Sequence, residues 1–405
     1  MSKEKIIILF TVFVDVLGIG IVIPILPFYV TEFGAGPTTV TILFSVFSFF
    51  AFLSSPWLGA LSDRIGRRPV MIGSIISTAI GWFVFAGATV VPMLFVGRII
   101  DGIAAGNLSI AQSTLVDIAK DDKERTQNLG IMGAAFGIGF MVGPLIGGLM
   151  SPISHAAPFW FAGGLATLNA IVAYFVLPET HHDLNTTTKL SVNPLAPLSR
   201  ALADVKIRPL YFSWIMFTMA FVTSQSVFAL FVEKVFGFDA FTTGLTFTGM
   251  GLIVALNQTV GLKYFWLRRF TEGQLETIMF SFMLGGLVLF ATQSFVAFII
   301  STLLIPTGQS VLRVVITSQV AGRADTKTKG AKLGTLSSLM SACMVVGPMI
   351  AGPLFEMHVS FPYFLASAYV IAGLIAALRY QRIQQRADQE LADTAPSPAL
   401  PVDGQ

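Results

Sequence analysis

Long, continuous runs of apolar residues dominate the chain and alternate with short polar segments. Twelve runs can be placed, at about residues 6–30, 41–61, 70–89, 92–118, 127–151, 157–177, 209–232, 242–262, 275–293, 295–322, 331–356 and 361–380. A helix needs about 20 apolar residues to cross a bilayer, and continuous runs favour helices over the alternating pattern of a membrane β-barrel. The pattern therefore predicts an all-α membrane protein with 12 transmembrane helices.

The composition agrees with a chain whose surface faces lipid. Of its 405 residues, 54% are hydrophobic and only 12% are charged, and the mean hydropathy is +0.77. A soluble globular protein carries about 25% charged residues. We therefore exclude a water-soluble enzyme, a nucleic-acid binder and a disordered scaffold. The lipid bilayer is an expected partner of the chain and nucleic acid is not.

The distribution of the basic residues gives an orientation. If the N-terminus is cytoplasmic, 22 of the 25 lysines and arginines fall in cytoplasmic segments, and only Lys234 falls in an outer loop. Membrane proteins keep such an excess of positive charge on the cytoplasmic side. The sequence therefore predicts a multi-pass protein of the cytoplasmic (inner) membrane with both termini in the cytoplasm, and we expect it to be monomeric.

The two halves of the chain repeat a pattern of glycines and proline. The fifth run contains Gly130, Gly139, Gly143, Pro144, Gly147 and Gly148. Moving 204 residues along the chain gives Gly334, Cys343, Gly347, Pro348, Ala351 and Gly352, so four of the six positions match. A repeat of this kind predicts two pseudo-symmetric six-helix bundles with a substrate site between them. We place the bundles at 1–177 and 209–382, a cytoplasmic linker at 178–208 and a disordered cytoplasmic tail at 383–405.

Ionisable residues inside a span are costly and mark functional sites. At about 100° per residue, two helices carry polar stripes on one face. The stripes are Arg98, Asp101, Ala105, Ser109 and Gln112 on the fourth span, and Thr302, Pro306, Gln309, Arg313 and Thr317 on the tenth. Both are expected to line a water-accessible cavity, whereas Asn107 points away from Arg98 and is expected to pack against a neighbouring helix. Further candidates for the cavity are Tyr29, Gln225, Asn257 and Gln258.

The carboxylates within the spans are candidates for proton coupling. A carboxylate in a poorly hydrated cavity can take up a proton near neutral pH, and a nearby arginine opposes that uptake. We assign proton coupling to Asp15 and Asp101, with Arg98 as the modulating partner of Asp101. The alternative is that Arg98 and Asp101 form a static ion pair that only stabilises their helix. Arg313 suggests a substrate with anionic or carbonyl groups, and an ion pair with Asp15 across the cavity is the alternative.

A charged, glycine-containing loop joins the second and third spans. It reads Gly59-Ala60-Leu61-Ser62-Asp63-Arg64-Ile65-Gly66-Arg67-Arg68-Pro69. Its glycines allow a tight turn, and its aspartate can cap a helix or pair with arginine. The loop matches every defined position of a signature of the major facilitator superfamily, which the chain resembles over nearly its whole length. Leu94, Arg98 and Gly102 match a second signature, and Leu177-Pro178-Glu179-Thr180 closes the sixth span as in many members.

Within that superfamily the chain resembles the drug:proton antiporters of the tetracycline-exporter type. The glycines and proline of the fifth span match the antiporter signature without a gap, and the first span, from Asp15 through Pro24 and Pro27, supports the same subgroup. The third span, Ala79-Ile80-Gly81-Trp82, lacks the carboxylate that tetracycline exporters carry there. The resemblance also implies a charged cytoplasmic gate that ties the first half to the start of the eleventh helix. Its residues here are Gly59, Asp63, Arg64, Gly66, Arg67 and Asp117.

These observations predict proton-coupled efflux of small amphipathic molecules or drugs by alternating access, with a small-molecule substrate and protons as partners. Two alternatives stay open: a transporter of a defined anionic metabolite such as a siderophore or organic acid, and a non-transporting membrane sensor. An enzyme, a metal site and a cofactor are not expected. All four histidines lie in loops or at span edges, and the sequence has no phosphate-binding glycine loop.

Overall fold

The computed structural model describes residues 3–180, 199, 207–323 and 328–394, and within these ranges the regular secondary structure is helical throughout. Twelve helical segments in the described ranges are long and apolar enough to cross a membrane. The predicted fold class and number of spans are therefore confirmed.

The first half of the chain forms the first six of these segments. Its helices are α1 (Lys3–Thr31), α2 (Pro37–Ile65), α3 (Arg67–Ala86), α4 (Val91–Ile103), α5 (Asn107–Asp117), α6 (Asp122–Met150) and α7 (Ala157–Val176). Local sequence sets several boundaries. Pro37 stands at the start of α2, and the Asp121 side chain caps α6 by accepting the Glu124 N–H at 2.7 Å.

The second half supplies the other six. Its helices are α9 (Arg208–Phe236), α10 (Ala240–Leu256), the π-helix η1 (Asn257–Trp266), α11 (Leu267–Arg269), α12 (Glu272–Ala291), α13 (Phe295–Gly322), α14 (Lys329–Met357) and α15 (Phe361–Thr394). Gly237 ends α9 in the left-handed region with φ of 67°, and Thr271 and Gln274 form a capping box at the start of α12. By length and composition, the eighth candidate span extends over α10, η1 and α11.

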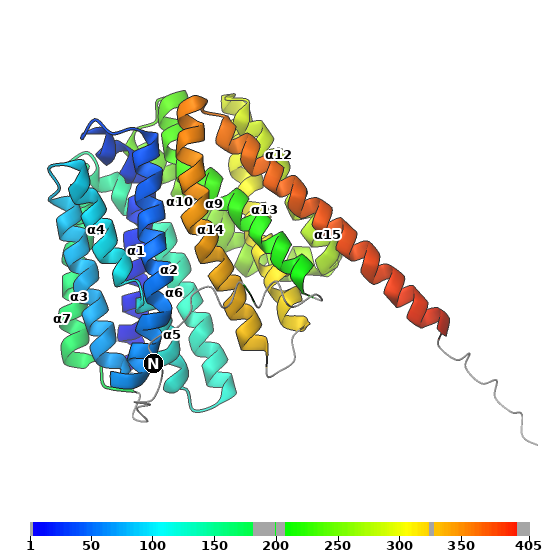
Figure 1. Cartoon of the computed structure of the whole chain (residues 1–405), viewed down its shortest axis with the longest axis horizontal. Helices are drawn as coiled ribbons and strands as arrows, with labels where there is room; N and C mark the ends of the chain where they lie inside the picture. Colours follow the sequence, from blue (N-terminus) through cyan, green and yellow to red (C-terminus); the bar gives the residue numbers. More distant parts are fainter. Residues whose placement is uncertain (1–2, 181–198, 200–206, 324–327, 395–405) are drawn as a thin grey trace, which may run out of the picture.

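The two halves lie side by side and meet mainly through two helix pairs. Figure 1 shows the N-terminal helices on the left and the C-terminal helices on the right. Across the boundary α2 packs against α14, and α6 packs against α10. In Figure 1 the halves converge at the upper edge, and α15 diverges from the N-terminal helices toward the lower right.

Two details of the predicted organisation are corrected. The fourth span is not one helix, because α4 ends at Ile103 and α5 begins at Asn107. The prediction of disorder from residue 383 is wrong for 383–394, where α15 continues as a helix. Residues 395–405, and most of the predicted linker at 178–208, lie outside the described residues.

Candidate functional site

A carboxylate and an amide meet in the middle of the first half. Asp15 lies near the centre of α1, and the Asn107 side chain, at the start of α5, donates a hydrogen bond to its Oδ1 at 3.2 Å. Asp15 is half-buried, whereas Asn107 is buried. Among the described residues Asp15 has no ion pair, so its charge is offset only by a neutral amide. A negative charge held this way in a span is costly, and proton uptake relieves the cost.

Asn107 is the partner that sequence reasoning missed. A continuous helix would turn Asn107 away from the stripe that holds Arg98. The chain is wound more tightly between α4 and α5, where Ala105 N–H bonds to the Gly102 carbonyl at 3.1 Å and Gly106 N–H to the Ala104 carbonyl at 2.6 Å. The small-residue segment Ala104-Ala105-Gly106 was the sequence signal that could have indicated this change of winding. As predicted, Asn107 packs against a neighbouring helix, but its contact there is with Asp15.

Arg98 and Asp101 form a buried ion pair on α4. The Arg98 guanidinium lies 3.6 Å from Asp101 Oδ2, and the two residues are only 4% and 7% exposed. The guanidinium also lies 4.5 Å from the Phe85 ring centre and 4.7 Å from that of Trp82, both on α3. The prediction that the stripe is water-lined is wrong for this outer part, because the aromatic rings of α3 cover the pair. This geometry fits the static ion pair that the sequence left as the alternative.

The inner part of the same stripe is more accessible. Ser109 is half-buried and its hydroxyl lies 3.0 Å from that of Ser55 on α2, and Gln112 is exposed. On α13, Gln309 is half-buried and Arg313 is exposed near the middle of its span. Among the described residues Arg313 forms no ion pair, so the structure does not pair it with Asp15. An exposed guanidinium at this depth would be costly in lipid, which favours a position in a water-filled cavity.

The remaining cavity candidates divide into three groups. The Tyr29 prediction is wrong: its side chain is 2% exposed and its hydroxyl donates to the Phe85 and Ala86 carbonyls at 3.0 and 3.1 Å. The Asn257 side chain is occupied, because it accepts from Trp266 Nε1 at 3.0 Å and donates to Thr307 Oγ1 at 3.3 Å. Gln225 is half-buried and Gln258 is exposed, and both stay candidates.

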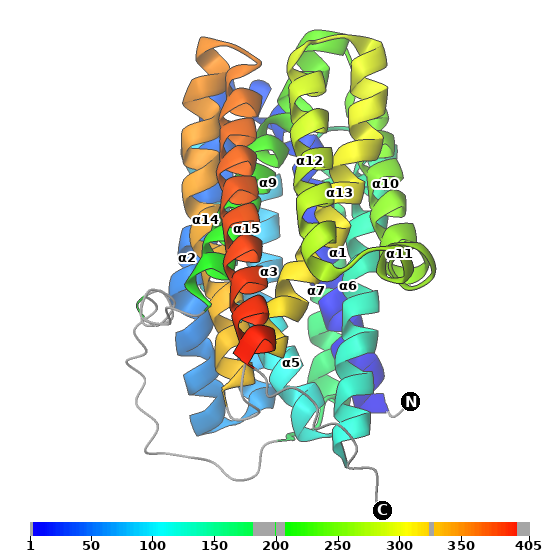
Figure 2. The same cartoon turned by 90° about the vertical axis from the view of Figure 1, so that its right-hand side faces the viewer.

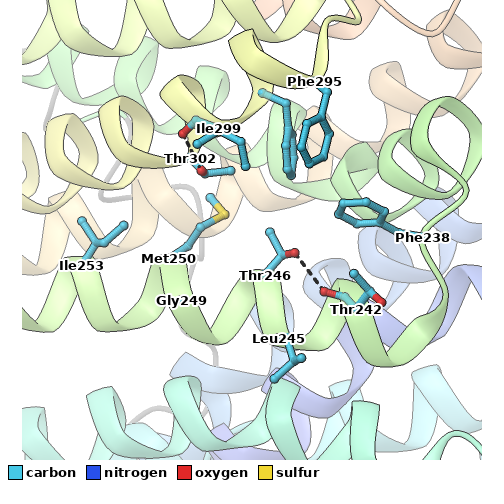
Figure 3. Close-up of a pocket in the computed structure, with 11 residues that line it drawn as sticks. Phe238, Thr242, Leu245, Thr246, Gly249, Met250, Ile253, Phe295, Ile299 and Thr302 are labelled. Atoms are coloured by element: carbon cyan, nitrogen blue, oxygen red, sulfur yellow. Dashed lines mark hydrogen bonds between the residues drawn. The ribbon is translucent and has the colours of Figure 1, made fainter.

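A separate hollow of about 360 Å³ lies between α10 and α13 (Figure 3). Its walls are apolar, with rings of Phe238 and Phe295 at one end. The threonine hydroxyls in it are used within their own helices: Thr246 donates to the Thr242 carbonyl at 2.9 Å, and Thr302 to the Ile299 carbonyl at 2.7 Å. Of the residues predicted to line a cavity, only Thr302 of the α13 stripe lines this hollow, and neither Asp15 nor Arg313 does.

Three of the predicted gate residues, Asp63, Arg67 and Asp117, form a cluster inside the first half. Arg67 is 2.6 Å from Asp63 and 3.1 Å from Asp117, and it donates to the Ser62 hydroxyl at 2.6 Å. Glu179 was not predicted as a member, yet its carboxylate accepts the N–H groups of Arg67 and Arg68 at 2.9 and 3.2 Å. A carboxylate at the first N–H groups of α3 also faces the positive end of the helix dipole. These contacts join α2, α3 and α5 with the segment after α7.

Gly66 is the most constrained position of this cluster. Its φ of 104° is one that L side chains avoid, and a Cβ there would collide with the Glu179 carboxylate. We expect Gly66→Ala to destabilise the protein by about 1–3 kcal/mol. Gly59→Ala is the matched control, because a Cβ at Gly59 meets no atom within 4 Å. Thermal unfolding of the purified protein in detergent should show a lower midpoint for the first variant only, and equal midpoints would contradict this assignment.

The glycines of the fifth-span motif differ in what they contact. A Cβ at Gly139 would lie 2.9 Å from the Phe13 carbonyl oxygen, and one at Gly143 would lie 2.7 Å from that of Leu17, so both allow α6 to approach α1 closely. Gly147 approaches α1 at Ile25, whereas Gly148 faces Phe241 of α10 in the other half. Around Gly130 no atom lies within 4 Å of such a Cβ. The motif therefore packs α6 on both sides at one end and leaves the other end open.

One buried acid in the second half was also missed. Glu276 lies near the start of α12, is 1% exposed and accepts a hydrogen bond from Gln319 at 3.1 Å. Arg323 in turn donates to the Gln319 side chain at 3.3 Å. This cluster joins the start of α12 to the end of α13, as the Arg67 cluster joins the start of α3 to the end of α5.

Twelve spans in two halves, with ionisable groups held between and within them, define a multi-pass membrane transporter. The family model of the Major Facilitator Superfamily matches residues 8–271, and the chain belongs to this superfamily. The predicted family is therefore confirmed, and membership of this transporter superfamily also confirms the prediction that the chain is not an enzyme.

Several known proteins are similar to the chain over most of its length. Multidrug resistance protein 1 of Bacillus subtilis (strain 168) is 29% identical, covering 94% of this chain and 98% of that protein. The class E tetracycline resistance protein of Escherichia coli is 31% identical, covering 86% and 87%. Among solved structures, the human organic anion transporter MFSD10 (TETRAN) superposes with a TM-score of 0.70 at 22% identity, covering 93% of this chain and 99% of that one. This last similarity supports the fold alone.

Proposed function

We propose that the protein exports small amphipathic molecules or drugs from the cytoplasm in exchange for protons. The observation that carries the proposal is the half-buried Asp15 carboxylate in mid-span, whose hydrogen-bond partner is the neutral Asn107. The charged form of a carboxylate is costly inside a membrane span, so such a group readily takes up a proton. The full-length similarity to proteins named for multidrug and tetracycline resistance supports this substrate class.

We propose that the protein lies in the inner membrane as a monomer. Both of its termini then lie in the cytoplasm. The distribution of lysine and arginine supports it. With this orientation, the close contacts of α2 with α14 and of α6 with α10 lie at the outer end. They include Gly244, where a Cβ would lie 2.5 Å from the Pro144 carbonyl oxygen, and Glu356, which accepts the Thr38 N–H at 3.0 Å. At the cytoplasmic end no atom lies within 4 Å of a Cβ added at Gly130 or Gly334, and this difference between the two ends supports an inward-open state.

The proposal is tested with the purified chain in proteoliposomes. An outwardly or inwardly directed ΔpH is imposed. The movement of a fluorescent lipophilic cation and the collapse of the pH gradient are then followed together. We expect substrate movement opposite to the proton flow, abolished by a protonophore. Movement that ignores the gradient would refute antiport, and ligand binding without any flux would instead identify a sensor.

A second substrate class is favoured by one observation. Arg313 is exposed in mid-span and has no ion pair among the described residues, so it can bind an anionic group of a substrate. Competition with matched panels of anionic and cationic ligands separates the two classes. Preference for anions, lost in Arg313→Gln, would establish transport of an anionic metabolite, and preference for lipophilic cations would reject it.

A further inference from the structure

The cytoplasmic end of the eighth span leaves the course of the other long helices. After α10 the chain forms the π-helix η1 and the short α11, and neither contains a buried residue. Figure 2 shows the coil labelled α11 end-on, at the edge of the molecule and crosswise to the long helices. This segment therefore runs along the plane of the membrane rather than across it.

A side-chain bracket holds the π-helix in this form. Residues nine apart lie on opposite faces of an α-helix, since nine residues make two and a half turns. In η1 the wider turn brings the Trp266 Nε1 to 3.0 Å from the Asn257 side-chain oxygen. Asn257 also donates to Thr307 of α13, which fixes the bracket to the bundle. The residues within this bracket and directly after it are thus held in a defined position. Single π-helical turns are frequent at functional sites.

Three cations and two aromatic rings gather on this segment. The Lys263 ammonium lies 5.1 Å, and the Arg268 guanidinium 5.5 Å, from the centre of the Tyr264 ring. The Arg269 guanidinium lies 4.4 Å from that of Phe265. The two rings are 53% and 39% exposed, so they do not serve as core. We call these five residues the basic-aromatic patch.

The patch has no internal neutralisation. Within the part of the chain that the structure describes, none of its three cations forms an ion pair, whereas Arg67 and Lys5 at the same end of the molecule pair with Asp117 and Glu124. The nearest acidic residue along the chain, Glu272, accepts a hydrogen bond from Ser318 at 2.7 Å. Three like charges held together on two exposed rings favour an external anion.

We infer that the basic-aromatic patch binds the phosphate headgroup of an anionic phospholipid in the cytoplasmic leaflet. Aromatic side chains prefer the headgroup level of a bilayer, and basic clusters at the cytoplasmic ends of spans bind anionic headgroups such as those of phosphatidylglycerol or cardiolipin. A segment that lies along the membrane plane brings both kinds of side chain to that level together. The inference uses the proposed cytoplasmic position of this end but not the identity of the transported substrate.

Native mass spectrometry of the full chain in a neutral detergent, titrated with cardiolipin, tests this inference. In Arg268→Gln/Arg269→Gln we expect the tightest cardiolipin site to weaken about 25-fold, because each cation near an anionic lipid contributes roughly fivefold. Arg208→Gln/Lys329→Gln is the matched control: it removes the same charge from two exposed cytoplasmic positions that lie over no described ring. It should stay within about twofold of the wild type, since bulk charge alone is screened.

Further variants keep the result decisive if the glutamine pair disturbs folding. Arg268→Lys/Arg269→Lys retains the charges and should keep most of the affinity, whereas Tyr264→Leu/Phe265→Leu retains them but should weaken binding about three- to tenfold by removing the rings. Phosphatidylcholine and inorganic phosphate should not compete. Equal losses in the patch and control variants, or equal binding of phosphatidylcholine and cardiolipin, would overturn the inference. The assay in detergent measures lipid binding and neither transport nor its direction. Such a failure would therefore leave the proposed transport function untouched.

Discussion

Asp15→Asn is expected to abolish proton-driven transport while substrate exchange without a gradient persists. Asparagine keeps the size of the side chain and a hydrogen bond to Asn107, which contacts Asp15 Oδ1 at 3.2 Å, but it cannot carry a proton. We expect ΔpH-driven uptake into inverted vesicles to fall at least about 100-fold, the scale on which a lost proton-transfer group acts. Uptake by exchange of labelled for unlabelled substrate, measured in the same vesicles, should fall much less.

Asp239→Asn is the matched control for this substitution. Asp239 lies outside the spans and caps α10 by accepting the Thr242 N–H at 2.8 Å. Hydrogen bonds from the Thr242 side chain and from this N–H lower the pKa of its carboxyl. Asparagine can replace aspartate in a helix cap, so this variant should transport like the wild type. If a proton gradient still drives substrate transport by Asp15→Asn, another group carries the proton. Glu276 is then the first group to test.

Much of the fold was predictable because it depends on features that are continuous in the sequence. Twelve apolar runs of about 20 residues leave little choice of architecture in a bilayer. The motif glycines were also readable: a Cβ at Gly143 of α6 would lie only 2.7 Å from the Leu17 carbonyl oxygen of α1, so no larger residue fits there. The boundaries failed where local winding changed, as between α4 and α5.

The site was less predictable, because its contacts are set by the packing of different helices. A uniform helical phase placed Asn107 away from the polar face, and the tight turn before it brought its amide to Asp15. Arg98 was expected in water because a lone cation in a span needs it. The sequence of one helix could not show that Trp82 and Phe85 of another would enclose the guanidinium.

Gly352→Val is the second substitution expected to have a large effect, because it opposes closure of the outer end. A Cβ at Gly352 would collide with the Thr41 hydroxyl and lie 2.8 Å from Thr38 Cα, so α14 and α2 could not approach as they do. Overpacking of this kind costs about 1–3 kcal/mol, which shifts a two-state equilibrium roughly 5- to 150-fold. We expect the inward-open state to lose population and transport to fall at least about tenfold, since both states are needed in each cycle.

The shift of state, rather than the loss of transport, decides this prediction. Spin labels at Val90 and Met357, which are 52% and 71% exposed and lie at the outer ends of the two halves, report the separation there in a variant that lacks Cys343. Gly352→Val should lengthen their distance distribution. Gly164→Val adds the same side chain to α7, where no atom lies within 4 Å, and should leave both distance and transport unchanged. Transport lost without any change in distance would mean that the contact of α14 with α2 only supports the fold. A longer distance would instead show that this contact, together with the Glu356 carboxylate on the Thr38 N–H, holds the outer gate shut.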